Sequence, residues 1–117
     1  VGSEMCIRDS MGPSDVILFV SYSGSTHDMM DTLSVAKKTG AKIILITHYP
    51  DAPGTALADV VLLCGALETP LDGGSIPVKV SELFVAESLI MRYLLDNREL
   101  AKIARDKTSV AMVAKFL

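Results

Sequence analysis

Three short apolar runs, separated by polar loops and helical stretches, dominate the pattern of this chain. They cover residues 16–20, 43–46 and 60–63, and none contains a polar position. Runs of this length that are rich in β-branched residues are typical of strands buried on both faces of a sheet. Apolar residues at helical spacing predict a helix over 26–39 and a longer one over about 78–95. Strands that alternate with helices indicate an α/β fold with a parallel sheet.

Shorter helical stretches complete the pattern. Residues 55–58 predict a short helix before the third strand, and residues 98–117 predict a helical tail in which Ser109 could be the N-cap of the last segment. No linker or internal repeat divides the chain. We therefore expect a partial doubly wound parallel sheet in a three-layer α/β/α arrangement.

The first ten residues do not fit this pattern. They show no periodicity and lead abruptly into Met11, Gly12 and Pro13. They resemble the translated adapter sequence that occurs at the ends of assembled environmental reads. We interpret residues 1–10 as a non-native leader and expect the native protein to continue upstream of this segment.

Composition narrows the class of protein further. Half of the 117 residues are hydrophobic and the mean hydropathy is +0.40, so a folded domain is expected rather than a disordered tail. The net charge of −3 and the scattered basic residues argue against a nucleic-acid surface. Cys6 and Cys64 form no disulfide or metal pattern, and His27 and His48 lack partner ligands. We expect no metal, no cofactor, no membrane span and a reducing cytoplasm.

The candidate chemistry lies in the loop of residues 21–26, between the first predicted strand and helix. Ligands of open α/β sheets bind at the carboxyl ends of strands, and a helix N-terminus favours anions. Gly24 allows close approach of the backbone, and the loop has no cation. Four hydroxyls can donate to phosphate oxygens, those of Ser21, Ser23, Ser25 and Thr26. The loop therefore predicts an anion site; the alternative is that Ser25 or Thr26 only caps the helix.

The stretch 15–26, an apolar strand followed by Ser-x-Ser-Gly-x-Thr, resembles the signature of the SIS (sugar isomerase) domain. The similarity continues through 36–47 and 51–59 and covers about residues 14–95. It implies a flavodoxin-like SIS fold that lacks its first strands and first ligand loop, with 14–97 as a partial SIS domain and 98–117 as a C-terminal helical tail.

The resemblance also implies a ligand, a sugar phosphate whose phosphate lies at Ser21, Ser23 and Thr26. The complete set of predicted ligand-binding residues is Ser21, Ser23, Gly24, Ser25, Thr26, Thr47, Ser75 and Lys79. Two positions depart from the family pattern: Ser25 stands where Glu is frequent, and His48 stands where Asn is common. Lys79 could equally be a surface charge.

Two functions from different classes are compatible with these residues. The region 68–75 resembles transcription regulators of the MurR/RpiR type, which implies an effector-sensing domain for carbohydrate metabolism, with DNA bound by a missing N-terminal domain and not by this segment. The alternative is an aldose-ketose sugar-phosphate isomerase, for which Glu68 is the best candidate base and His48 the second. Each of these two side chains could equally have no catalytic role.

The long predicted helix has more apolar positions than one sheet face would cover. They are Leu83, Phe84, Ala86, Leu89, Ile90, Met91 and Leu94. Such a surplus indicates a dimer surface, and packing in the core of the domain is the alternative. We therefore expect a homo-oligomer.

Overall fold

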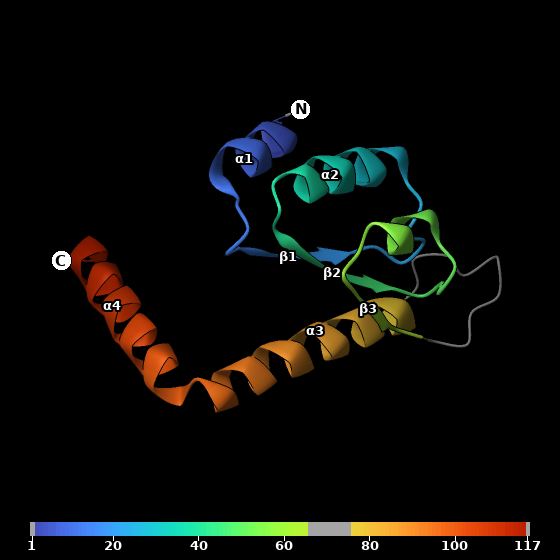
Figure 1. Cartoon of the computed structure of the whole chain (residues 1–117). Coiled ribbons are helices and arrows are strands. Elements are labelled where there is room, and N and C mark those ends of the chain that lie inside the picture. Colours follow the sequence, from blue (N-terminus) through green and yellow to red (C-terminus); the bar gives the residue numbers. More distant parts are fainter. Residues whose placement is uncertain (1, 66–75, 117) are drawn as a thin grey trace. The chain divides into compact units, whose positions relative to one another are not determined.

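A parallel three-stranded sheet in the order β1-β2-β3 organises the first part of the chain (Figure 1). The computed structural model describes residues 2–65 and 76–116. β1 (Val16–Val20) pairs with β2 (Lys42–Thr47), and β2 pairs with β3 (Val60–Leu63). The bounds of β1 and β3 agree with the sequence prediction, and a parallel sheet flanked by helices confirms the α/β class.

The helices follow the strands in the predicted order. They are α1 (Gly2–Ser10), α2 (His27–Lys38), η1 (Pro53–Ala56), α3 (Ile76–Asp96) and α4 (Arg98–Phe116). Two predictions are corrected. The short helix before β3 is a 3-10 turn that starts earlier, with Pro53 at its first position, where a missing N–H costs nothing. Ser109 lies inside the continuous helix α4 and is not an N-cap.

The chain divides into two compact units, Val1–Val85 and Ala86–Leu117. In the first unit, α1 and α2 lie over the same face of the sheet (Figure 1). The core beneath them is a cluster of buried apolar side chains: Ile17, Leu33, Ala36, Ala41 and Ile43. It joins the inner faces of β1, β2 and α2, so that burial of apolar area stabilises this layer.

Residues 2–10 form a helix that the sequence pattern did not predict. α1 packs against α2, and Ile7 and Met11 contact the buried core. Two apolar side chains are too few to show a helical period in the sequence. The non-native origin of residues 1–10 stays a prediction.

The prediction that the first strand is buried on both faces is wrong for the described residues. Ile17 is buried, but its neighbours Val16, Leu18 and Val20 are 59%, 39% and 49% exposed. These three point to the opposite face, because successive strand residues alternate. β1 is also the edge of the described sheet, with β2 as its only partner there. A continuous apolar run therefore has one covered face in this structure.

Helices α3 and α4 carry many exposed apolar side chains. Leu83 and Phe84 of α3 are 68% and 73% exposed, and Leu100 and Val110 of α4 are 64% and 71% exposed. Within the described ranges, no helix is both long and apolar enough to cross a bilayer. The homo-oligomer stays a prediction.

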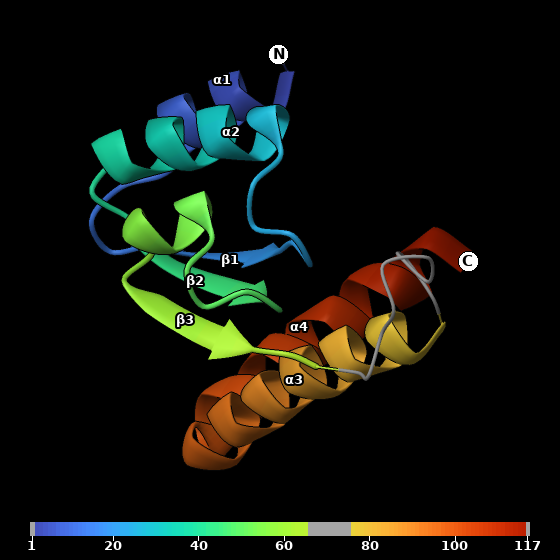
Figure 2. The ribbon, with the colours of Figure 1, turned by 90° about the vertical axis from the view of Figure 1, so that its right-hand side faces the viewer.

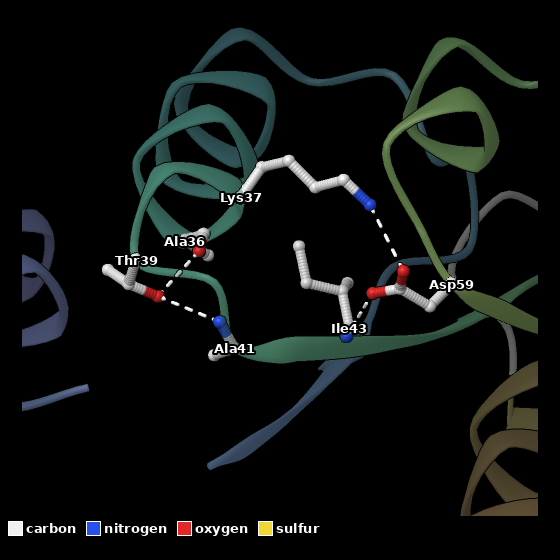
Figure 3. A network of polar contacts seen from close by, with 6 residues as sticks. All are labelled: Ala36, Lys37, Thr39, Ala41, Ile43 and Asp59. Carbon is white, nitrogen blue, oxygen red and sulfur yellow. Dashed lines mark hydrogen bonds and ion pairs between the residues drawn. The ribbon is translucent and has the colours of Figure 1, made fainter. Parts of the chain in front are cut away.

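The connection from α2 to β2 is fixed by one threonine (Figure 3). Thr39 Oγ1 donates to the Ala36 carbonyl at 2.7 Å and accepts from the Ala41 N–H at 3.2 Å. Gly40, at φ +82°, turns the chain between them in the left-handed region that favours glycine. This hydroxyl therefore pairs both a helix-end carbonyl and the first N–H of the turn into the strand.

Asp59 joins three elements just before β3 (Figure 3). Its Oδ2 accepts from the Ile43 N–H at 2.8 Å, and its Oδ1 pairs with Lys37 Nζ at 3.1 Å. These contacts, the backbone hydrogen bond first and the Lys37 hydrogen bond second, hold the pKa of this carboxyl below its ordinary value of 3.8.

We predict that Asp59→Asn lowers the urea midpoint of unfolding at pH 7 and flattens its acid dependence. Because the folded-state pKa is lowered, the ionised carboxylate stabilises the fold above pH 3.8, and this contribution is lost as the pH falls through the folded pKa. Urea titrations from pH 7 to pH 3 should show the two proteins converging at the acid end. Asp51→Asn is the matched control, an exposed carboxylate without a described partner. Parallel curves for the wild type and Asp59→Asn would contradict the assignment.

Candidate functional site

The candidate site is the loop of residues 21–26, which leaves the carboxyl end of β1 and enters α2. Because the sheet is parallel, the carboxyl ends of β1, β2 and β3 lie at the same edge (Figure 2). The residues that follow β2 therefore lie beside this loop. Open α/β sheets bind ligands at such an edge.

The loop is tied to the end of β2 by backbone and side-chain hydrogen bonds. Ser21 N donates to the Ile46 carbonyl at 2.9 Å, and the Tyr22 carbonyl accepts from both His48 N and Thr47 Oγ1 at 3.0 Å. Thr47 is fully buried. Its hydroxyl, predicted to contact the ligand, is directed to the backbone of the loop and holds the loop in place.

Gly24 sits at the tightest point of the loop. Its φ is +61°, and a Cβ built on it would lie 2.7 Å from Ala52 Cβ and 2.9 Å from Thr47 Oγ1. The Gly24 carbonyl accepts from Gly54 N at 2.9 Å, and its N–H donates to Ser21 Oγ at 3.2 Å. No other residue type fits this backbone conformation and this space without strain.

The loop hydroxyls differ in what they do. Ser21 Oγ accepts within the loop, whereas the part of the chain that the structure describes supplies no partner for the hydroxyls of Ser23, Ser25 and Thr26. Thr26 is the N-cap residue of α2 but makes no side-chain cap hydrogen bond. Capping therefore does not account for these hydroxyls. Ser23 is half-buried, yet no described buried side-chain oxygen lacks a partner, so its hydroxyl is open to solvent.

The electrostatics of the loop come from the helix end rather than from cations. The first turn of α2 contributes unpaired N–H groups, and its acidic residue is Asp28. An anion at Ser23, Ser25 and Thr26 would be held by neutral donors. Such a site suits reversible binding more than permanent capture.

Three aromatic rings adjoin the loop, a cluster that sequence reasoning did not find. Tyr22 stacks on His48 with ring centroids 4.9 Å apart and planes 13° apart. Tyr49 meets both edge-on, at 5.7 Å from Tyr22 and 4.8 Å from His48. His48 Nδ1 lies 2.9 Å from the Cys64 carbonyl. Val20 and Ile46 are paired in the parallel sheet, and Tyr22 and His48 follow them by two positions each. The register of β1 on β2 therefore brings the two rings together.

Cys64 lies at the end of β3 beside this cluster. Its side chain is buried, and burial, followed by the charge of Glu82, raises the pKa of the thiol. A thiol that stays protonated is a poor nucleophile and a poor metal ligand. Cys64 therefore packs as a small apolar residue, and its carbonyl forms the hydrogen bond with His48 Nδ1.

Of the remaining predicted residues, Lys79 is the one that lies in the part of the chain that the structure describes. Lys79 is exposed in the first turn of α3, and no described hydrogen bond or ion pair joins it to residues 21–26. Glu68 and Ser75 lie outside the described residues. Among residues 2–65 and 76–116, no group of three or more His, Cys, Asp or Glu side chains could hold a metal.

Comparison with known proteins gives the class. Residues 4–92 match the SIS domain, so the chain belongs to the SIS domain family. Its relatives include the HTH-type transcriptional regulator RpiR of Escherichia coli, 38% identical over 94 residues, and an HTH-type transcriptional regulator of Haemophilus influenzae, 33% identical over 95 residues. These matches cover 80% and 81% of this chain. The chain spans about a third of each relative, 32% and 33%.

Other relatives extend the comparison. The 3-hexulose-6-phosphate isomerase of Mycobacterium gastri is 30% identical over 96 residues, which cover 77% of this chain and 48% of that enzyme. The Vibrio vulnificus NanR protein, solved in complex with ManNAc-6P, superposes on 96% of this chain and 42% of its own, with a TM-score of 0.79 and 24% identity. At that identity, the superposition supports the SIS fold alone.

We predict that Gly24→Ala destabilises the protein by about 1–3 kcal/mol, because a left-handed residue gains a Cβ that overlaps Ala52 and Thr47. Chemical denaturation followed by circular dichroism measures this difference. Gly12→Ala is the matched control, since its added Cβ would find its nearest neighbour only at 4.0 Å, and it should change the free energy of unfolding little. Equal effects of the two substitutions would refute the close-approach explanation.

Proposed function

We propose that this chain is the phosphosugar-binding part of a transcriptional regulator of carbohydrate metabolism, and that it senses its ligand without converting it. The phosphate would bind at Ser21, Ser23 and Thr26, with Gly24 and Ser25 completing the loop. The observation that carries the proposal is that the described residues supply no partner for the hydroxyls of Ser23, Ser25 and Thr26, while the Ser21 hydroxyl accepts from Gly24 N and can still donate to a ligand. Oriented neutral donors at a helix end suit a phosphate dianion.

The regulator half of the proposal is supported by the relatives. Proteins described as HTH-type transcriptional regulators match four-fifths of this chain, and the chain spans a third of them. The remaining length leaves room for a separate DNA-binding domain. In this proposal DNA is bound there, in the cytoplasm, and this segment of net charge −3 makes no DNA contact.

The oligomeric part of the proposal rests on α3 and α4. Their exposed apolar side chains include Leu83, Phe84, Ile90, Met91 and Leu100. A second copy of the chain would cover such side chains. A homodimer would also match a DNA-binding partner domain that reads two half-sites.

The alternative function is a sugar-phosphate isomerase, favoured by the similarity to the Mycobacterium gastri enzyme. Isomerisation needs a base within hydrogen-bond reach of the proton that it removes. His48 donates through Nδ1 to the Cys64 carbonyl and keeps Nε2 as an acceptor, so it stays a candidate base, and Glu68 is the other candidate. Sensing requires only a phosphate anchor, sugar contacts and two states of different affinity.

We predict that Ser23→Ala and Thr26→Ala each weaken sugar-phosphate binding by about 1–3 kcal/mol, the range for a lost hydrogen bond to a charged group. Isothermal titration calorimetry with hexose phosphates measures the change, and the unphosphorylated sugars should bind poorly. Ser14→Ala is the control, because this exposed serine precedes β1 at the opposite edge of the sheet. Equal affinity for a sugar and its phosphate would exclude a phosphate site.

We further predict that the full-length protein shows sugar-phosphate-dependent DNA binding and no turnover. Incubation with hexose phosphates, followed by NMR, should show no ketose or epimer, while fluorescence anisotropy should show that the same compounds change the affinity for operator DNA. Glu68→Gln separates the two functions. Turnover that is lost in this variant would establish the isomerase instead.

A further inference from the structure

We propose that Tyr22, His48 and Tyr49 form the sugar-recognition part of the site, in which His48 Nε2 accepts a hydrogen bond from a hydroxyl group of the ligand. This inference rests on the proposed phosphate site in the adjoining loop and assigns the recognition of the sugar itself. Tyr22 belongs to that loop, between two of its serines, so the ring cluster adjoins the loop that carries the proposed phosphate donors.

The hydrogen bond to Cys64 determines the tautomer of His48. A carbonyl oxygen can only accept, so Nδ1, 2.9 Å away, must carry the proton. In the neutral ring, Nε2 is then an acceptor with a lone pair. The stacked ring of Tyr22 and the edge-on ring of Tyr49 fix the plane of the imidazole and therefore the direction of that lone pair.

Nε2 is open to a ligand. The described residues provide no hydrogen-bond partner for it, and no described buried side-chain nitrogen lacks a partner. This atom must therefore be reached by solvent, although the residue as a whole is half-buried. Tyr49 beside it is 50% exposed, so a ligand can also contact an aromatic ring.

The chemistry of Nε2 assigns it to the sugar and not to the phosphate. A phosphate dianion presents only acceptor oxygens, which an acceptor nitrogen does not bind. A sugar hydroxyl can donate to Nε2, and the apolar C–H faces of a sugar can pack on an aromatic ring. The loop hydroxyls therefore supply donors to the phosphate, and His48 supplies the complementary acceptor to the sugar.

Two substitutions of His48 separate its contact with Cys64 from its contact with the ligand. In His48→Asn, the side-chain amide reaches the position of Nδ1 and can donate to the Cys64 carbonyl, but no atom replaces Nε2. In His48→Gln, the longer side chain reaches the position of Nε2 and can accept, but the bond to Cys64 is lost. A merely positioning role predicts that Asn preserves binding, whereas direct recognition predicts that Gln preserves it.

The experiment is isothermal titration calorimetry on the full-length wild type and variants with glucose 6-phosphate, fructose 6-phosphate and ribose 5-phosphate, with a thermal melt of each protein. For the sugar phosphate that the wild type binds, His48→Asn should lose about threefold to tenfold in affinity, the effect of one neutral hydrogen bond, and His48→Gln should lose less. The melting temperatures should rank in the opposite order, with Asn above Gln. Ser14→Ala, an exposed serine before the amino end of β1, is the control and should change neither quantity.

The outcomes are distinguishable. Wild-type affinity in His48→Asn overturns the recognition role, and equal losses in Asn and Gln overturn it as well. Loss of binding in Ser23→Ala, together with unchanged binding in every His48 variant, leaves the phosphate site standing and refutes this inference alone. Binding of none of the three sugar phosphates by the wild type overturns both proposals.

Discussion

The close approach of Gly24 to the end of β2 is the constraint on which the candidate site depends. A left-handed residue without a Cβ lets the loop lie against Thr47 and Ala52, and the Gly24 carbonyl is paired with Gly54. The buried Thr47 hydroxyl supports the same loop through the Tyr22 carbonyl. Ser21 N, the Tyr22 carbonyl and both backbone groups of Gly24 are thus paired within the protein, and these hydrogen bonds hold this part of the loop without a ligand.

The hydroxyl side chains in and beside the loop therefore have different roles. The hydroxyls of Ser21 and Thr47 are used inside the loop, while those of Ser23, Ser25 and Thr26 have no described partner. Preorganised donors lose little conformational freedom when a ligand binds. Without a cation, each donor adds a modest increment to the binding free energy. The occupancy of the site should therefore change over a working range of ligand concentrations, as sensing requires.

The sequence predicted the strands well, because β-branched runs without polar positions have few alternatives. It predicted the structure less well where contacts between residues distant in the sequence determine it. Exposure of Val16, Leu18 and Val20 depends on whether anything packs on that face, and helix α1 gains order from Ile7 against the core. Similarly, Ser109 can cap a helix only if the chain turns there, and α4 continues through it. These outcomes depend on tertiary contacts, which local sequence propensity does not determine.

The site shows the same limit at the level of single residues. The hydroxyl loop stands out in the sequence because its members are consecutive, but the sequence does not show that Thr47 is buried with its hydroxyl on the Tyr22 carbonyl. The ring cluster was not predictable, since Tyr22 and His48 meet only through the parallel register that pairs Val20 with Ile46. In the proposed site, one register therefore places the phosphate donors after the first strand and the His48 acceptor after the second. In this proposal, a ligand with a phosphate and hydroxyl groups would bridge the two strand ends. The distance between the phosphate donors and the His48 acceptor, and not either set of residues alone, would then determine which ligand binds.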